Sequence, residues 1–288
     1  MRSSFHVGAL ISPTGIIYVD NPPQTIQEKE IMEERIENGI GMIAGAWPLD
    51  PNKSTIFFIH GSVGSKTLWQ DQVAALSERA NTVAIDLPGH GISKGPGKDK
   101  VEEYARVVLQ FIDETSIPNP IPCGLSIGGA IVLRLLIDFK ERFRAGILVN
   151  TGARLRVMPA IFDAIKNDFP AFAESVPTMG IVSECFDQEK RLRLAEEARA
   201  NDPDVIYGNF KACDAFDVMS RLKEIDMPVL VLAADGDMLT PPKYSQYLKD
   251  NIVSAEMTMI HNAGHLSPIE KPDEINAAVT AFLDRHQL

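Results

Sequence analysis

Three residues in this chain have the types and the order that nucleophilic acyl transfer requires. Ser126 stands in a Gly-x-Ser-x-Gly pentapeptide at 124–128, and Asp237 and His265 follow it in that order. A serine hydroxyl is a weak nucleophile near neutral pH, so it needs a base within hydrogen-bond reach and a group that orients the base. The sequence therefore predicts Ser126 as the nucleophile, His265 as the base and Asp237 as the orienting acid.

The local sequence around each of these residues agrees with its predicted role. Ser126 lies between a short apolar stretch and a helical pattern, where a strained turn can expose a serine for attack. His265 lies in a glycine-containing loop after the apolar run 257–260, and Asp237 follows the apolar run 229–234. Loops at the ends of buried strands are frequent sites of function.

Two other residues compete for the roles of acid and base. Asp235 stands closer to the end of its strand than Asp237, and His261 stands closer to the end of its strand than His265. Gly236 and the following Thr-Pro favour Asp237, because they place it at the bend of the loop. The Gly-His loop and the chain order favour His265.

An oxyanion that develops on the substrate needs hydrogen-bond donors already in place. We expect one from the backbone N–H of Ile127, which follows the nucleophile at a helix N-terminus. We expect the other from the backbone N–H of Ser62, in the loop that follows a buried strand and begins with His60-Gly61.

Apolar strand patterns alternate with helical patterns through much of the chain, which predicts an α/β fold with a mostly parallel central sheet and helices on both faces. The expected strands are 55–59, 82–85, 146–149 and 229–232, and the expected helices begin near 65, 101 and 127. The segment 117–123 should be the strand that leads into Ser126. Because it contains three prolines, we expect that strand to be short or irregular.

The alternation stops between residues 152 and 224, where helical patterns are interrupted by prolines. We interpret 152–224 as an inserted helical cap, or lid, on a core made of 1–151 and 225–288. Phenylalanines and methionines in the cap can form its own core or line an apolar pocket. In the first 50 residues we expect β-ribbon at 9–20 and again at 36–47, with a helical stretch at 25–37 between these two parts.

The composition excludes several classes of partner. The 288 residues are 45% hydrophobic and carry a formal net charge of −11, so there is no cationic surplus for nucleic acid or anionic lipid. Cys123, Cys185 and Cys213 lack metal-ligand spacing, and we expect them to be buried and inert. Without an apolar run long enough to span a bilayer, and without an export signal, we expect a cytoplasmic protein. We expect no cofactor and no metal. The composition leaves open whether the protein forms a homo-oligomer.

Several motifs occur together in the order typical of the α/β-hydrolase superfamily with a helical cap, which the chain resembles from about residue 55 to its C-terminus. These motifs are His60-Gly61, Asp86-Leu87-Pro88-Gly89-His90-Gly91, Gly124-Leu125-Ser126-Ile127-Gly128-Gly129, Gly236-Asp237 with Thr240-Pro241, and Gly264-His265. The elbow and acid loop are similar to those of small carboxylesterases and enol-lactonases. This resemblance implies a serine hydrolase acting on an ester or lactone of a small, apolar acyl or aryl substrate.

Two other functions fit the same residues. The triad can serve a carbon–carbon bond hydrolase or an acyltransferase, and in the former Arg154 and Arg156 can bind a substrate carboxylate. The fold can also serve as a receptor that binds a small molecule without turnover. Efficient covalent labelling of Ser126 would count against a receptor, because labelling requires an activated nucleophile.

Overall fold

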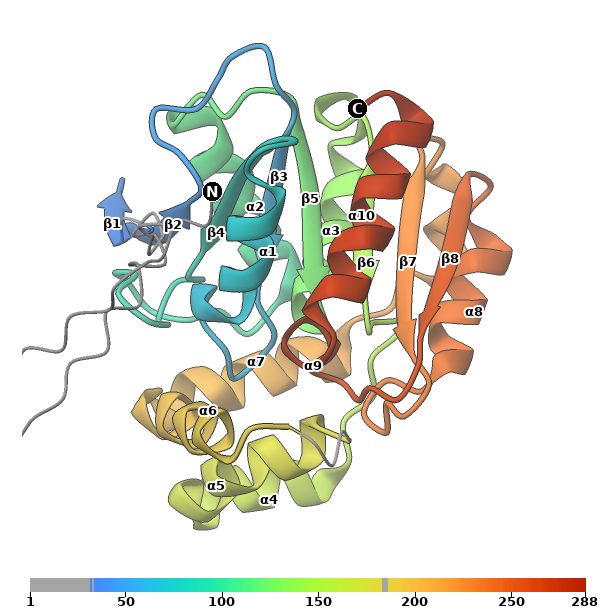
Figure 1. Cartoon of the computed structure of the whole chain (residues 1–288). Helices are drawn as coiled ribbons and strands as arrows, with labels where there is room; N and C mark the ends of the chain where they lie inside the picture. The colour runs from blue at the N-terminus through green and yellow to red at the C-terminus, as the bar shows by residue number, and fades with distance from the viewer. Residues whose placement is uncertain (1–31, 33, 183–185) are drawn as a thin grey trace, which may run out of the picture. The chain divides into compact units, whose positions relative to one another are not determined.

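The computed structural model describes residue 32 and residues 34–182 and 186–288, and these form one compact unit. Its centre is an eight-stranded sheet with the order β1-β2-β4-β3-β5-β6-β7-β8 (Figure 1). The strands are β1 (Glu34–Glu37), β2 (Ile40–Ala44), β3 (Thr55–Ile59), β4 (Asn81–Ile85), β5 (Pro120–Leu125), β6 (Gly146–Val149), β7 (Val229–Ala234) and β8 (Ala255–Ile260). All neighbours from β4 to β8 pair in parallel, whereas β1 and β2 are antiparallel. The predicted α/β fold is confirmed.

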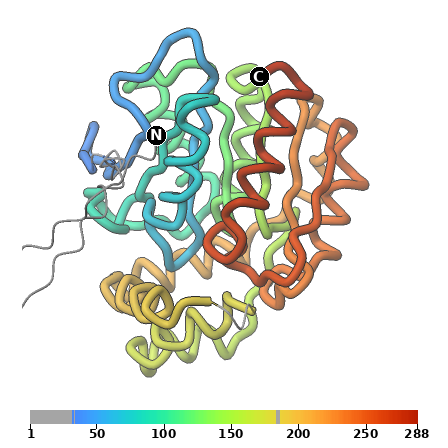
Figure 2. The backbone as a smooth tube through the Cα atoms, in the orientation of Figure 1, coloured from blue at the N-terminus to red at the C-terminus, as the bar shows by residue number. Residues whose placement is uncertain are grey.

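Helices cover both faces of the sheet, because alternate side chains of each buried strand point to opposite faces. Phe57 and Ile59 of β3 belong to the core under α2, α3 and α8, and Ile56 and Phe58 belong to the core under α1 and α10. The traces in Figures 1 and 2 show this layering. These helices are α1 (Gln70–Leu76), α2 (Val101–Glu114), α3 (Ile127–Asp138), α8 (Pro242–Asn251), α9 (Ser267–Glu270) and α10 (Pro272–His286).

The predicted helix starts agree with the structure. The Ser65 side chain accepts a hydrogen bond from the Thr67 N–H, 3.3 Å away, at the start of the 3₁₀ helix η1 (Lys66–Trp69) that leads into α1. Near the N-terminus, the ribbon predicted at 36–47 corresponds to β1 and β2. The helix predicted at 25–37 is wrong at its end, since residues 34–37 form β1. Apart from residue 32, the rest of that helix and the ribbon predicted at 9–20 lie outside the described residues.

Strand β5 corrects the expectation that the proline-rich segment is short or irregular. It has six residues, and it pairs with β3 from Pro120 to Gly124 but with β6 only from Cys123 onward. The Asn119 carbonyl accepts from β3, so by strand alternation the nitrogens of Pro120 and Pro122 point toward the β6 side. Both prolines stand before Cys123, the first residue that pairs with β6, so the absence of their N–H groups removes no hydrogen bond between β5 and β6.

The segment between β6 and β7 is helical, as predicted for 152–224. It contains α4 (Pro159–Asn167), α5 (Phe169–Gly180), α6 (Gln188–Ala200), α7 (Pro203–Ala215) and the 3₁₀ helix η3 (Met219–Glu224). Three of the prolines that interrupt the pattern lie in the first two positions of α4, α5 and α7, where a missing N–H costs nothing. In the described part of the chain, no helix combines the length and apolar character needed to cross a membrane.

Candidate active site

Ser126 occupies a strained turn between β5 and α3, with φ 57° and ψ −119°. The turn is possible because the flanking glycines let strand and helix approach closely. A Cβ atom on Gly124 would lie 2.2 Å from the Gly128 backbone, and one on Gly128 would lie 2.4 Å from the Ile59 carbonyl oxygen. The two glycines of the pentapeptide are therefore a steric requirement of the turn that carries Ser126.

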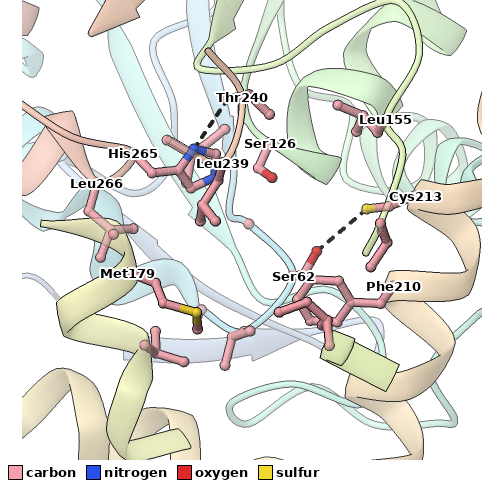
Figure 3. Close-up of a pocket in the computed structure, with 18 of the residues that line it drawn as sticks. Ser62, Ser126, Leu155, Met179, Phe210, Cys213, Leu239, Thr240, His265 and Leu266 are labelled. Carbon is pink, nitrogen blue, oxygen red and sulfur yellow. Dashed lines mark hydrogen bonds between the residues drawn. The ribbon is translucent and has the colours of Figure 1, made fainter. Parts of the chain in front are cut away.

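His265 and Asp237 are brought together from the loops after β8 and β7. The His265 Nδ1 atom lies 2.8 Å from Asp237 Oδ2, and both residues are buried. Among the described residues no side chain hydrogen-bonds the Ser126 hydroxyl, but Ser126 and His265 line the same pocket (Figure 3). Catalytic hydrogen bonds are often long without substrate and shorten when it binds.

The Asp237 carboxylate is held by four hydrogen bonds. Its Oδ1 atom accepts from the backbone N–H groups of Leu239 and Thr240, at 2.8 and 2.9 Å, and Oδ2 accepts from the Thr240 hydroxyl at 2.7 Å in addition to His265. Burial alone would raise the pKa of Asp237, but the charge of His265 and these hydrogen bonds outweigh it and lower that pKa. The carboxylate is therefore ionised at neutral pH.

The two competing residues, Asp235 and His261, pair with each other instead. His261 Nδ1 lies 2.9 Å from Asp235 Oδ2, and both side chains are well exposed to solvent. Neither lines the pocket that contains Ser126 and His265. Because only His265 lines the pocket with Ser126, and Asp237 is its partner, the geometry favours Asp237 and His265.

Asn150 is a site residue that sequence reasoning missed. It follows β6, adopts φ 42° and is fully buried. Its Nδ2 atom donates to the His265 and Gly264 carbonyl oxygens at 2.9 and 3.3 Å and to Ser267 Oγ at 2.9 Å, and its Oδ1 atom accepts from the Ala234 N–H at 3.0 Å. One side chain thus ties the end of β7 to the histidine loop. Only a polar residue directly after a buried strand hinted at this contact.

Of the two predicted oxyanion residues, Ile127 directly follows Ser126 and Ser62 belongs to another loop at the same pocket. Ile127 begins α3, so its N–H is among those that lack a partner within the helix. Ser62 lines the same pocket. Its N–H belongs to the peptide group whose carbonyl oxygen is that of Gly61, and this oxygen accepts hydrogen bonds from His60 Nδ1 at 2.7 Å and from the Gly64 N–H at 3.2 Å. Because N–H and C=O point in opposite directions across a trans peptide, these bonds also orient the Ser62 N–H.

The pocket above Ser126 has a volume of about 360 Å³ and lies between the sheet and the helical segment. Its walls are mostly apolar and include Val63, Ile161, Phe172, Val176, Met179 and Phe210. Phe172 and Phe169 also form part of the helical segment's own core, so both expected uses of its aromatic residues occur. Figure 3 shows Met179 and Phe210 on the side opposite Ser126.

Few charged or metal-binding groups reach this pocket. Its charged lining residues are Arg156, which donates to the Asp214 carbonyl oxygen, and Glu197, whose pKa is raised by burial. Arg154 lies outside the lining and is 3.9 Å from Asp217. Cys123 and Cys213 are buried as expected, and burial raises the pKa of Cys213 to about 12. The described residues contain no cluster of His, Cys, Asp and Glu able to hold a metal ion.

Sequence comparison assigns the chain to a family. A model of the alpha/beta hydrolase family matches residues 56–278, which run from β3 into α10. The chain belongs to the alpha/beta hydrolase family. The resemblance seen in its motifs is thereby confirmed, and the matched region contains Ser126, Asp237 and His265.

Individual proteins are similar to this chain over most of its length. It is 26% identical to 3-oxoadipate enol-lactonase 2 of Acinetobacter baylyi, over 81% of this chain and 90% of that one. A solved enol-lactonase from Burkholderia xenovorans is 25% identical, with a TM-score of 0.77 over 88% of this chain and 100% of that one. A solved thermophilic esterase is 29% identical, with a TM-score of 0.75 over 88% and 97%.

We predict that His60 makes the fold sensitive to acid. It is completely buried, its Nε2 atom accepts from the Leu87 N–H at 3.0 Å, and burial, with a smaller contribution from the neighbouring His90, lowers its pKa to about 3. The unfolded chain binds a proton on this residue below about pH 6.5 while the folded chain does not, so stability is lost as pH falls from 6.5 toward 3. The expected contribution is on the order of 1 kcal/mol of unfolding free energy per pH unit.

Urea unfolding at a series of pH values measures this contribution. The His60→Asn variant should be less stable than the parent at neutral pH. It should lose less stability on acidification, because asparagine at this position does not bind a proton. Equal slopes for the parent and His60→Asn would contradict the prediction.

Proposed function

We propose that this protein is a serine hydrolase that cleaves a carboxylic ester or lactone through an acyl-enzyme. The observation that carries the proposal is the buried Asp237–His265 pair, whose histidine lines the same apolar pocket as Ser126. The family supports it, and so do the relatives, which include enol-lactonases and an esterase. Esters and lactones share one chemistry, since in both a carbonyl carbon exchanges an oxygen substituent.

Acylation begins when Ser126 Oγ attacks the substrate carbonyl carbon and His265 Nε2 takes the hydroxyl proton. Asp237 holds the Nδ1–H of His265 at 2.8 Å, which fixes the tautomer and stabilises the imidazolium that forms. The backbone N–H groups of Ser62 and Ile127 donate to the oxyanion. The intermediate then collapses, the bond to the leaving oxygen breaks, and His265 returns its proton to that oxygen.

Deacylation repeats these steps with water as the nucleophile. His265 takes a proton from water as it attacks the acyl carbon, and gives the proton to Ser126 Oγ when the ester bond breaks. A lactone follows the same route, except that its leaving hydroxyl stays attached to the acyl group. The acid and the restored enzyme are then released.

The pocket favours a small substrate with an apolar acyl or aryl group. Its walls are predominantly apolar, and about 360 Å³ suits a small molecule. The helical segment 152–224 supplies much of the wall opposite Ser126, through residues such as Phe172 and Met179. We assign it the role of a lid, which sets substrate size and shields the acyl-enzyme from bulk water.

We predict serine-dependent hydrolysis of p-nitrophenyl esters. A series from two to sixteen carbons, measured by p-nitrophenolate release, should show an optimum among the shorter chains because the cavity is small. Ser126→Ala should lower kcat by about 10⁴-fold or more, since the nucleophile is lost.

The matched control is Ser62→Ala, which keeps the backbone N–H and removes only a hydroxyl paired with Cys213. It should retain most of the parent's turnover. If Ser126→Ala hydrolyses the esters as fast as the parent, the proposal fails. Tight binding of small molecules without turnover would favour a receptor instead.

A second prediction separates the two acidic residues after β7. Asp237→Asn should lower kcat by about 10⁴-fold, as in the well-studied serine proteases, because His265 loses the group that sets its tautomer. Asp235→Asn should leave kcat within about twofold, because its carboxylate faces the exposed His261. Steady-state kinetics on one ester measures both, and a large loss in Asp235→Asn alone would reverse the assignment.

A further inference from the structure

The loop 61–64 carries the proposed oxyanion donor of Ser62, and two of its carbonyl groups are held by side chains from the helical segment. Asn209 of α7 donates through Nδ2 to the Ser62 carbonyl oxygen at 2.7 Å. Asn201, at the end of α6, donates through Nδ2 to the next carbonyl oxygen, that of Val63, at 3.1 Å. The loop is therefore fixed by residues about 140 positions away in the sequence.

Asn209 is the more constrained of the two contacts. It is completely buried, and its Nδ2 atom also lies 2.8 Å from His90 Nε2. An amide nitrogen can only donate, so His90 Nε2 accepts and its proton stands on Nδ1, which faces the Pro88 carbonyl oxygen at 3.2 Å. Burial lowers the pKa of His90, which agrees with this neutral form.

The orientation of the Asn209 amide follows from its other partner. Tyr104 of α2 accepts a hydrogen bond from the Lys98 N–H at 2.9 Å, and its hydroxyl donates to Asn209 Oδ1 at 2.6 Å. With Oδ1 facing Tyr104, the two hydrogens on Nδ2 face Ser62 and His90. Every hydrogen-bonding atom of the side chain is thus used, and the amide has one favourable orientation.

We propose that Asn209 is a positioning residue that holds the oxyanion loop in its donating geometry. The inference rests on the proposed function, because it concerns the Ser62 N–H of that site. His60 and Gly64 hold the peptide before Ser62 through the Gly61 carbonyl, and Asn209 holds the peptide after it. Both backbone dihedrals of Ser62 are fixed between these two anchored peptides.

This role gives the helical segment a second task besides covering the pocket. Because α7 anchors the loop, a displacement of α7 would move an oxyanion donor as well as a pocket wall. Donors placed before the reaction contribute most to the transition state, where the negative charge develops. Loss of the anchor should therefore reduce the rate of the chemical step more than it weakens substrate binding.

Kinetics of Asn209→Ala and Asn209→Asp test the proposal. Both should lower kcat on a p-nitrophenyl ester by up to about 10²-fold with KM within about twofold, since a small misplacement of one donor costs that much. The affinity for a boronic acid that forms a tetrahedral adduct with Ser126 should fall by a similar factor. A residue needed only for folding would change the melting temperature without this selective loss.

Two further variants complete the experiment. Asn251→Ala removes an asparagine whose Nδ2 donates to the Tyr247 carbonyl oxygen within α8, and should leave kcat and boronate affinity unchanged. Tyr104→Phe removes the hydroxyl that donates to Asn209 Oδ1 and so weakens the orientation of the amide. It should give a smaller loss of kcat than Asn209→Ala. It keeps the test valid if Asn209 variants fail to fold.

The outcomes separate this inference from the proposed function. If the parent hydrolyses esters through Ser126 but folded Asn209 variants keep its kcat and boronate affinity, the positioning role is wrong and the hydrolase stands. A rise in KM with unchanged kcat in the Asn209 variants would also overturn the positioning role, because Asn209 would then act on substrate binding. If the parent shows no Ser126-dependent turnover, both proposals fail.

Discussion

The rest of the site depends on the close approach of β5 to α3 at Ser126. A single methyl group at position 124 or 128 would overlap backbone atoms, so the strand turns into the helix without space for any other side chain. This geometry holds Ser126 at φ 57° and puts the first amide of α3 immediately after it. Nucleophile and one proposed oxyanion donor therefore come from one rigid turn, and the other groups must be brought to it.

Two buried asparagines help to hold the other proposed catalytic groups near this turn. Asn150 ties the end of β7 to the loop of His265, and Asn209 ties the helical segment to the loop of Ser62. Asn150 satisfies three backbone groups at the carboxyl end of the sheet, and Asn209 satisfies one backbone carbonyl and bonds the side chains of His90 and Tyr104. The proposed site is therefore assembled from four loops whose relative positions are set by hydrogen bonds, not by loop sequence alone.

Much of this arrangement follows from the sequence. The β-branched run 55–59 forms β3 with the predicted bounds, because a strand buried on both faces needs an uninterrupted apolar run. The Gly-x-Ser-x-Gly motif and the loops of Asp237 and His265 were identified because their glycines and positions after strands are local signals. Neither the roles of these residues nor a separate cap domain follows from the fold alone.

What the sequence missed depends on contacts between distant residues. Asn209 carries no local signal and Asn150 only its place after a buried strand, since their partners lie 84 to 147 positions away. The regularity of β5 depends on which side of the strand its proline nitrogens face, and only the register with β3 and β6 decides that. The pairing of Asp235 with His261 likewise emerges only when β7 and β8 lie side by side.

The most direct test of the central claim is to label the protein with a fluorophosphonate and map the modified peptide by mass spectrometry. Such a probe reacts with a serine only when a neighbouring base activates it. The account predicts one adduct, on Ser126, and none on Ser62, which lines the same pocket with its hydroxyl 3.6 Å from Cys213 Sγ. An adduct on Ser62, or no adduct on the folded protein, would contradict it.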